Sequence, residues 1–539
     1  MHRVLVCDPL APEGLAILER TSGIDVDNRN GLKGDALRAA LAESDGCIIR
    51  SGTTLTSDLL RGQSRLKVIV RAGVGVDNID VDAATREGIV VRNTPGGNTI
   101  STAEQTIALL FAVFRHVPAA DASMRAGKWD RKTFVGTQLA GKTIGVIGLG
   151  RVGLAVAKRA IGLEMKVLGY DPFLSSERAA ELGIESVPNL ADIYPRVDVL
   201  TVHVPMTEET RGLIGEKEIA AMRKGSYILN CARGGIVDEA ALYAGLKSGK
   251  IAGAGLDVFS EEPPTNSPLL ALPNVVVTPH LGASTAEAQL NVAIEAAQLL
   301  SDFFTNGNVR FAVNMGSIDP AELADLRRHL DIAHRLGLIQ AQMVKGTIKR
   351  ATVAFMGEAA RKNTKLISAS FAMGLLERRL EEEVNLVNAM MLARERGIQI
   401  SEHISSEPSD FSTLIRTEVE TDQETFVASG TTRGTLYNRL VRLGPYRLDT
   451  FMDGTMLIYT HEDKPGLIGF VGTAFGKHGV NIAQMTVGRK QPGGDAIGVL
   501  ALDSEPPEAA LAEIRSDPRI SSVQVVKLPP FGQVPKGIG

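Results

Sequence analysis

The most constraining feature of the sequence is a glycine-rich turn between an apolar segment and a helix-forming segment. Residues 146–153 read Val-Ile-Gly-Leu-Gly-Arg-Val-Gly, and Leu154–Ile161 has a helical pattern. Glycines at this spacing permit a tight turn, let backbone N–H groups approach a diphosphate, and let the helix pack closely on a sheet. The diphosphate then lies at the positive end of the helix. The pattern favours a dinucleotide-binding turn, with Gly148, Gly150 and Gly153, over an ordinary glycine turn.

An acidic residue follows the next apolar segment. Asp171 comes directly after Lys166–Tyr170, which has the pattern of a strand. A carboxylate at this position accepts hydrogen bonds from both ribose hydroxyls and repels a 2′-phosphate. The sequence therefore predicts NAD rather than NADP as the cofactor.

Composition narrows the class of protein. A chain of 539 residues is too long for one core, so we expect three or four domains. With 44% hydrophobic and 22% charged residues and a net charge of −4, it has the composition of a globular protein and no basic stripe. The longest apolar runs, such as Ile107–Phe114, are too short to span a bilayer. These features argue against nucleic-acid and membrane partners.

The first residues and the cysteines indicate a compartment. Residues 1–8 have the pattern of a first strand and contain no signal-peptide core. Cys7, Cys47 and Cys231 are scattered and odd in number, which fits neither a disulfide framework nor a metal site. We expect a cytoplasmic protein without a bound metal.

Strand and helix patterns predict an α/β fold in which one domain is inserted into another. Short apolar strands alternate with helices over 1–96, and the pattern repeats with stronger strands from 97 to 284. A helix from Ser284 to about Phe304 should return the chain to the first lobe. We expect a Rossmann-type NAD domain (97–284) inserted into a flavodoxin-like substrate domain (1–96 and 285–308), with the substrate in the cleft between them.

The remaining chain divides into a mixed α+β segment, a compact repeat of strands and helices, and a tail. Residues 309–450 favour a packing or oligomerisation domain; a second effector site using Arg433, Arg439 and Arg442 is the alternative. Residues 455–528 have the strand–helix–strand–strand–helix–strand order of a ferredoxin-like domain. Residues 529–539, rich in Pro and Gly, should form a flexible tail.

Three side chains that follow predicted strands supply the chemistry of alcohol oxidation. His280 can accept a hydroxyl proton, Glu262 can orient the imidazole and raise its proton affinity, and the fork of Arg233 suits a 2-hydroxy carboxylate. Each has a structural alternative when taken alone: a core histidine, a helix-start carboxylate and a surface cation. Their shared position at strand ends of a dinucleotide fold favours a joint catalytic role.

These motifs resemble those of a known enzyme family. Residues 148–153, Asn230–Gly235, Leu256–Pro263 and Pro279–Ser284 look like the D-isomer-specific 2-hydroxyacid dehydrogenases. The whole chain resembles the long-form phosphoglycerate dehydrogenases of that family, which add an intervening domain and a C-terminal ACT domain. The resemblance implies that Arg233 binds the substrate carboxylate and reacting oxygen, and that Glu262 orients His280. The NAD contacts that it implies, besides the motif glycines, are Val74, Arg151, Val152, Asp171, His203, Val204, Pro205, Cys231, Ala232, Asp257, His280 and Gly282.

Further arginines indicate a phosphorylated substrate. Arg50 and Arg71 end two predicted strands of the first lobe, and the turn that follows Arg71 offers backbone N–H groups of Gly73, Val74 and Gly75 to a carboxylate. Two arginines supply more positive charge than one carboxylate needs, so a phosphate is the expected guest, although pairing with nearby acids is the alternative. The resemblance implies that Arg50 and Arg71 meet this phosphate, that Asn98 contacts the substrate, and that Arg131 reaches in from a dimer partner.

The C-terminal segment resembles an ACT module. The resemblance implies that His461 and Asp463, with Asn481 across a paired domain, hold an amino acid, in the first instance L-serine. A carboxylate suits an α-ammonium group and a helix N-terminus suits an α-carboxylate. A purely structural dimerisation module is the alternative.

Together the resemblances imply a particular reaction. We expect NAD-dependent oxidation of D-3-phosphoglycerate to 3-phosphohydroxypyruvate, the first step of L-serine biosynthesis, with feedback by serine, in a homodimer or homotetramer. One rival is another D-2-hydroxyacid dehydrogenase, such as a glyoxylate, hydroxypyruvate or 2-oxoglutarate reductase. The other is a non-catalytic NAD-sensing regulator.

Overall fold

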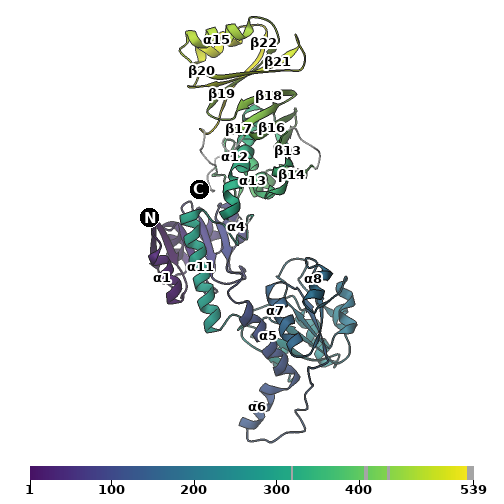
Figure 1. Cartoon of the computed structure of the whole chain (residues 1–539). Helices are drawn as coiled ribbons and strands as arrows, with labels where there is room; N and C mark the ends of the chain where they lie inside the picture. Colours follow the sequence, from purple (N-terminus) through teal and green to yellow (C-terminus); the bar gives the residue numbers. More distant parts are fainter. Residues whose placement is uncertain (317–319, 381, 406–410, 434–436, 531–539) are drawn as a thin grey trace.

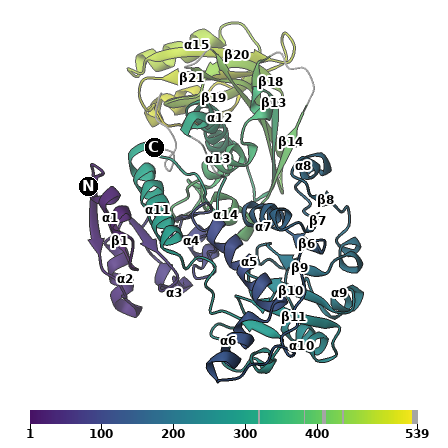
Figure 2. The same ribbon diagram turned by 60° about the horizontal axis from the view of Figure 1, so that its bottom comes forward.

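The computed structural model arranges the chain around four β-sheets. It describes residues 1–316, 320–380, 382–405, 411–433 and 437–530. Figure 1 shows the first sheet beside helix α11, the second sheet below it, and the two C-terminal sheets above it. Figure 2 shows the same ribbon turned by 60°. The second sheet lies between the strands of the first sheet and α11 in sequence, so the insertion expected from the sequence is present.

The first sheet is parallel, with the flavodoxin-like order β2-β1-β3-β4-β5. Its central strands are buried on both faces, as β1 shows: Val4 and Val6 pack against α11, whereas Leu5 points to the opposite core. Strand β2 was not predicted from the sequence, because Ile24–Asn28 is a polar edge strand with only one buried residue. The elements are β1 (His2–Val6), α1 (Pro12–Arg20), β2 (Ile24–Asn28), α2 (Gly34–Ala42), β3 (Gly46–Ile49), α3 (Ser57–Leu60), β4 (Val68–Arg71), α4 (Val81–Arg86), β5 (Val90–Asn93) and α11 (Ala286–Asn306).

The second sheet is also parallel, with the order β12-β11-β10-β9-β6-β7-β8. The chain builds outward from β6 in one direction and then restarts at β9 on the other side of β6, so the strand order reverses there. Open α/β sheets bind ligands at the carboxyl ends of strands at such a reversal. The elements are α5 (Thr99–Phe114), α6 (Val117–Arg125), β6 (Thr143–Ile147), α7 (Arg151–Gly162), β7 (Lys166–Tyr170), α8 (Ser176–Glu181), β8 (Glu185–Ser186), η1 (Leu190–Asp192), η2 (Tyr194–Arg196), β9 (Val199–Val202), α9 (Glu216–Ala221), β10 (Ser226–Asn230), α10 (Glu239–Lys247), β11 (Ile251–Leu256), η3 (Pro268–Ala271) and β12 (Val275–Val277).

The third sheet has the order β14-β13-β15-β16-β17-β18 and is antiparallel except for the β13–β14 pair. Helices α12 and α13 lie against it and share its core. An ion pair between Arg86 and Glu395, at 2.8 Å, joins this unit to the first one near α4. The elements are α12 (Pro320–Met343), β13 (Ile348–Gly357), η4 (Glu358–Arg361), α13 (Thr364–Leu376), α14 (Ala389–Glu395), β14 (Gln399–Ile404), β15 (Thr413–Thr421), β16 (Thr425–Arg433), β17 (Tyr437–Leu443) and β18 (Tyr446–Phe451).

The fourth sheet has the ferredoxin-like order β20-β21-β19-β22, with both of its helices on one face. Its other face is not open, because Met456 and Ile458 belong to the same core as the third unit. The elements are β19 (Thr455–Glu462), α15 (Leu467–Lys477), β20 (Ile482–Arg489), β21 (Asp495–Leu502), α16 (Glu508–Arg515) and β22 (Ile520–Lys527).

The start of the C-terminal tail is fixed to the third unit. Arg335 of α12 is buried and donates hydrogen bonds to the carbonyl oxygens of Met452, Pro529 and Pro530. Pro529 and Pro530, the first two residues of the predicted flexible tail, are thus hydrogen-bonded to α12. The rest of that predicted tail, 531–539, lies outside the described residues.

Among the described residues, no single helix is long and apolar enough to cross a membrane. Helices α5 and α6 reach the length and apolar content of a membrane span only together, and a bend of 63° separates them.

The close crossing of α12 and α13 gives a test of the fold. A Cβ on Gly374 would lie 2.1 Å from the carbonyl oxygen of His334, so Gly374→Ala must push the two helices apart. We expect a fall in the free energy of unfolding of about 1–3 kcal/mol, measured by urea or thermal unfolding. Gly162→Ala is the control, because nothing lies within 4 Å of an added Cβ there and alanine favours the helix. An unchanged unfolding midpoint in Gly374→Ala would contradict the crossing.

Candidate active site

Two of the three predicted catalytic side chains are in direct contact. His280 follows β12 and Glu262 follows β11, and Nδ1 of His280 lies 2.8 Å from Oε2 of Glu262. Because a carboxylate only accepts hydrogen bonds, the proton of the neutral imidazole is on Nδ1 and the lone pair is on Nε2. Glu262 is itself fixed, since its Oε1 accepts a hydrogen bond from the Phe259 N–H at 3.1 Å. The pair is partly exposed, so a substrate can reach it.

Arg233, the third predicted catalytic residue, reaches from the second unit to the first. It follows β10, and its Nε donates to Oδ2 of Asp77 at 3.0 Å. Its Nη2 lies 1.7 Å from where a Cβ on Gly75 would be, so only glycine leaves room for the guanidinium. Asp77 is in the turn after β4. Arg233 is therefore held against the turn that the sequence predicted as a carboxylate cradle.

Two more arginines converge on the same turn. Nη1 of Arg71 occupies the space that a Cβ on Gly73 would need, at 1.7 Å. Burial, together with the charges of Arg233 and Arg50, lowers the pKa of Arg71 to about 10. Its buried Nε has no hydrogen-bond partner within the described chain. Mutually repelling guanidinium groups, one of them with an unused donor, indicate a site for an anionic ligand.

Arg50 lies at the edge of this cluster. Its guanidinium donates to the carbonyl oxygen of Pro9 at 2.8 Å and to Oε1 of Gln289 in α11. Of the other predicted substrate residues, Asn98 is the N-cap residue of α5 and its Oδ1 is buried without a partner in the described structure.

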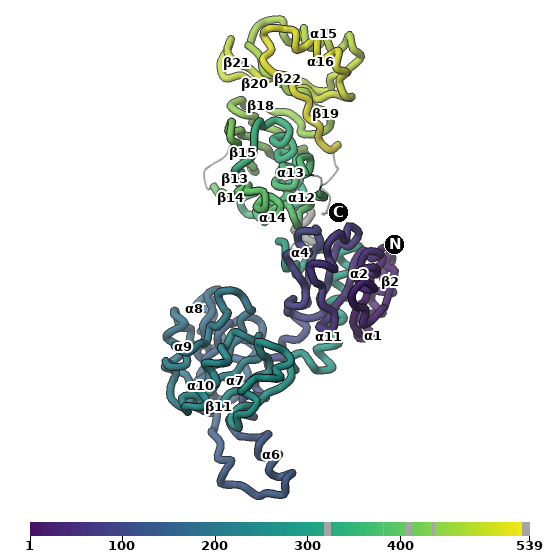
Figure 3. Tube along the Cα trace, turned by 180° about the vertical axis from the view of Figure 1, so that it is seen from behind, coloured from purple at the N-terminus to yellow at the C-terminus, as the bar shows by residue number. Residues whose placement is uncertain are grey.

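Arg131 does not join the cluster within one chain. It is exposed and lies in the long loop after α6. Figures 1 and 3 show α6 and this loop projecting from the second unit on the side away from the first.

The glycine turn has the geometry of a diphosphate site. Gly148 has a φ of 87°, which favours glycine, and a Cβ on Gly153 would lie 1.9 Å from the Gly148 carbonyl oxygen. Gly150 is the N-cap residue of α7; it offers no side-chain cap, and nothing lies within 4 Å of where its Cβ would be. The first N–H groups of the helix are thus free to bind an anion.

Asp171 is tied to the same turn. Its Oδ2 accepts from the Leu149 N–H at 2.7 Å and its Oδ1 from the Phe173 N–H at 2.8 Å. A carboxylate has about four acceptor positions, so lone pairs remain for ribose hydroxyls. The residues present fit a dinucleotide.

The other predicted cofactor residues also gather at this edge. Val204 and Pro205 follow β9, and Cys231 and Ala232 follow β10; Val74 lies in the first-unit turn, next to Gly75, which borders Arg233. Burial raises the pKa of the Cys231 thiol to about 12, so it remains a thiol. The backbone of His203 lies against Gly148, and desolvation lowers the pKa of its ring to about 4. The remaining predicted cofactor residues are Arg151 and Val152, the first two residues of α7, and Asp257 and Gly282. The Gly282 N–H donates to Oδ2 of Asp257.

The predicted effector residues are not brought together within one chain. His461 pairs with Ala496 at one end of β21, whereas Asn481 precedes Ile482, which pairs with Leu502 at the other end. Asp463 accepts from Gly493 and Arg489, and these two contacts lower the pKa of the Asp463 carboxyl. His461 donates from Nδ1 to the Glu462 carbonyl oxygen, and its buried Nε2 has no partner in the described chain.

The alternative effector arginines of the third unit are engaged locally. Arg433 and Arg439 both approach Asp449, at 3.7 and 2.6 Å, and Arg442 donates to the carbonyl oxygen of Gly444. Each of the three therefore has a contact within its own unit.

Sequence reasoning missed two side chains next to the site. Asp77 belongs to the turn after Arg71 that was predicted to bind a carboxylate. Its ion pair with Arg233 was not predicted, because the two residues are 156 positions apart in the sequence. Gln105 gave no signal, because it lies on an otherwise ordinary helix.

Comparisons with known proteins agree with this geometry. Residues 107–282 match the family model of the D-isomer specific 2-hydroxyacid dehydrogenase, NAD binding domain. Residues 325–444 match the D-3-phosphoglycerate dehydrogenase intervening domain, and 455–519 match the ACT domain. The chain therefore contains an NAD-binding domain of the D-isomer-specific 2-hydroxyacid dehydrogenase class.

Full-length relatives narrow the class further. D-3-phosphoglycerate dehydrogenase of Archaeoglobus fulgidus is 44% identical over 95% of this chain and 97% of the relative. The enzymes of the same name from Methanocaldococcus jannaschii and Bacillus subtilis are 42% and 40% identical, over 98% of this chain and 100% of each relative. The chain belongs to the D-3-phosphoglycerate dehydrogenase family, in its long form with intervening and ACT domains.

Solved structures of wider relatives cover the first two units. A glyoxylate reductase from Paecilomyes thermophila has a TM-score of 0.53 at 29% identity, covering 58% of this chain and 98% of that chain. An NAD-dependent formate dehydrogenase from Staphylococcus aureus, in complex with NAD, has a TM-score of 0.51 at 27% identity, covering 56% of this chain and 96% of that chain.

Proposed function

We propose that the chain oxidises D-3-phosphoglycerate to 3-phosphohydroxypyruvate with NAD, in the cytoplasm, as the first step of L-serine synthesis. The names of its relatives support the substrate. The observation that carries the proposal is the cluster of Arg50, Arg71 and Arg233, which offers more positive charge than a single carboxylate requires. The three buried, reduced cysteines support a reducing compartment.

The proposed reaction begins with the substrate bound across the two units. Arg233 binds the carboxylate and the reacting oxygen, and the turn after Arg71 offers its N–H groups. Nε2 of His280 takes the hydroxyl proton while the hydride leaves the carbinol carbon, and Glu262 stabilises the imidazolium that forms. NAD, when bound, supplies the nicotinamide carbon that accepts the hydride.

We also propose the substrate-binding residues and the domain boundaries that were predicted from the sequence. Arg71 and Arg50 meet the phosphate, with Asn98 and the backbone of Gly73, Val74 and Gly75 around the rest of the substrate. We place the substrate domain at 1–96 and 285–308, the NAD domain at 97–284, the intervening domain at 309–450 and the ACT domain at 455–528.

The arginine cluster predicts selectivity for a phosphorylated substrate. We expect NADH formation from D-3-phosphoglycerate and much slower formation from D-glycerate. Arg71→Leu should raise KM for the phosphorylated substrate by about 10- to 100-fold, since a charged hydrogen-bonding group is lost, and should reduce the difference between the two substrates.

Arg61→Leu is the matched control, because Arg61 is exposed in the same unit and pairs only weakly with Asp58. Equal rates for both substrates, or an unchanged KM in Arg71→Leu, would favour a reductase of another 2-oxo acid. An absence of NADH with every 2-hydroxy acid would favour an NAD-sensing protein.

A second copy of the chain completes the proposed site. Arg131 lies in the loop after α6, which projects from the second unit on the side away from the first, so we propose that Arg131 reaches the active site of a partner in a homodimer or homotetramer.

L-Serine is the proposed effector of the ACT domain. The unpartnered Nε2 of His461 can accept a hydrogen bond, Asp463 supplies a carboxylate, and Asn481 at the opposite end of the sheet would come from a paired domain.

Millimolar L-serine should slow NADH formation and raise the melting temperature, because a ligand that binds only the folded state stabilises it. His461→Ala should abolish both effects, and D-serine is the control ligand. If L-serine changes neither the rate nor the melting temperature, the regulatory proposal fails.

A further inference from the structure

The backbone of His280 is in an uncommon conformation. Its φ is 56°, in the left-handed region that non-glycine residues rarely adopt. Such conformations cost roughly 1–3 kcal/mol and persist where the surroundings hold them firmly. The groups that hold this turn therefore determine where the imidazole points.

The buried side chain of Asp257 is the centre of that support. Its carboxylate accepts from the Leu281 N–H and the Gly282 N–H, each at 2.8 Å, and from Oγ1 of Thr278 at 2.5 Å. The carbonyl oxygen of Asp257 also accepts from the His280 N–H, at 2.9 Å. Asp257 thus bonds to the turn on both sides of His280 and to His280 itself.

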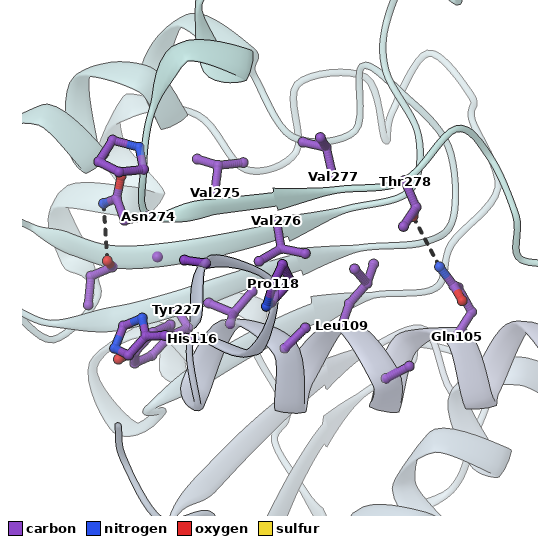
Figure 4. A pocket seen from close by; sticks show the side chains of 17 residues that line it. Gln105, Leu109, His116, Pro118, Tyr227, Asn274, Val275, Val276, Val277 and Thr278 are labelled. Carbon is purple, nitrogen blue, oxygen red and sulfur yellow. Dashed lines mark hydrogen bonds between the residues drawn. The ribbon is translucent and has the colours of Figure 1, made fainter. Parts of the chain in front are cut away.

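A side chain from a different element extends this support. Gln105 lies on α5, and its Nε2 donates to Oγ1 of Thr278 at 3.0 Å (Figure 4) and to Oδ1 of Asp257 at 3.5 Å. Because an amide nitrogen only donates, the Thr278 hydroxyl accepts from Gln105 and gives its own proton to Asp257. The direction of each hydrogen bond is therefore fixed, and the Thr278 hydroxyl has one rotamer that satisfies both neighbours.

Gln105 and Thr278 stand at one end of a cavity whose other polar lining residues, His116, Tyr227 and Asn274, lie toward the opposite end (Figure 4). The cavity has a volume of about 450 Å³ and lies between α5 and the strands β11 and β12. Leu109, Val113 and Val276 line it, as Figure 4 shows in part. Beside Gln105 and Thr278, the carboxylate of Asp257 accepts from both the amide and the hydroxyl, so the three groups form one hydrogen-bonded set.

We propose that Gln105 and Thr278 are positioning residues for proton transfer, acting through Asp257 on the turn that carries His280. Their side chains contact each other and Asp257 rather than the imidazole of His280. The inference rests on the proposed function, since it assigns these residues to the step in which His280 accepts the hydroxyl proton.

Conservative substitutions test the proposal. Thr278→Val keeps the shape and removes the hydroxyl, and Gln105→Leu removes the amide. Each should lower kcat by about 10- to 100-fold, because a displacement of about 1 Å in a reacting group can cost that much. KM and the NADH dissociation constant should stay within about two-fold, since Asp257, the predicted cofactor residue that both side chains contact, keeps its carboxylate and its bonds to Leu281 and Gly282. Thr278→Ser should restore most of the rate.

Glu104→Gln is the matched control on the same helix, because Glu104 is exposed and pairs with Arg159 rather than with the turn. The melting temperature of each variant separates positioning from unfolding: a lower kcat in a sample that melts like the parent supports the proposal. A kcat equal to that of the parent in Thr278→Val, or a loss of NADH affinity that matches the loss of rate, overturns it. A parent chain without turnover of D-3-phosphoglycerate overturns the proposed function instead.

Discussion

The hydrogen bond between His280 and Glu262 is the contact on which the account of this chain depends. It fixes the tautomer of the imidazole, so Nε2 carries the lone pair that a proton acceptor needs. Glu262 lies in the turn after β11 and His280 in the turn after β12, so no helix or strand holds either side chain in position. The buried carboxylate of Asp257 and its bonds to the His280 turn supply the rigidity that a loop lacks.

The second constraint is electrostatic and connects the two halves of the cleft. Arg233 lies in the nucleotide-binding half but is held by Asp77 of the other half, beside Arg71. The positive charges of Arg233 and Arg71 are tolerated at short range because the carboxylate of Asp77 offsets part of their repulsion. Asp77 is exposed, so its ion pair with Arg233 is weak, and an anionic substrate can take the place of Asp77. Arg71 ends β4 and Arg233 follows β10, so both lie at the carboxyl ends of parallel strands, where open α/β sheets bind their ligands.

Local patterns determine how much could be predicted from the sequence. The glycine turn at Gly148 and the strand-end positions of His280, Glu262 and Arg233 were predictable because short motifs specify them, and the parallel character of the first sheet followed from its alternating elements. Strand β2 was missed because its residues are polar. In the third sheet, which was also missed, β15 to β18 pair as consecutive hairpins, whereas the pairs that β13 makes with β14 and β15 connect distant segments. The hydrogen bonds of Arg335 to Pro529 and of Gln105 to Thr278 could not be predicted either, because each joins residues far apart in the sequence that share no motif.

The central claim is that His280 accepts the alcohol proton, and single-turnover NADH formation in His280→Gln tests it most directly. In a variant that melts and binds NADH like the parent, we expect the rate to fall by about 10²- to 10⁴-fold, the usual contribution of a general base. A folded variant whose single-turnover rate equals that of the parent would contradict the account.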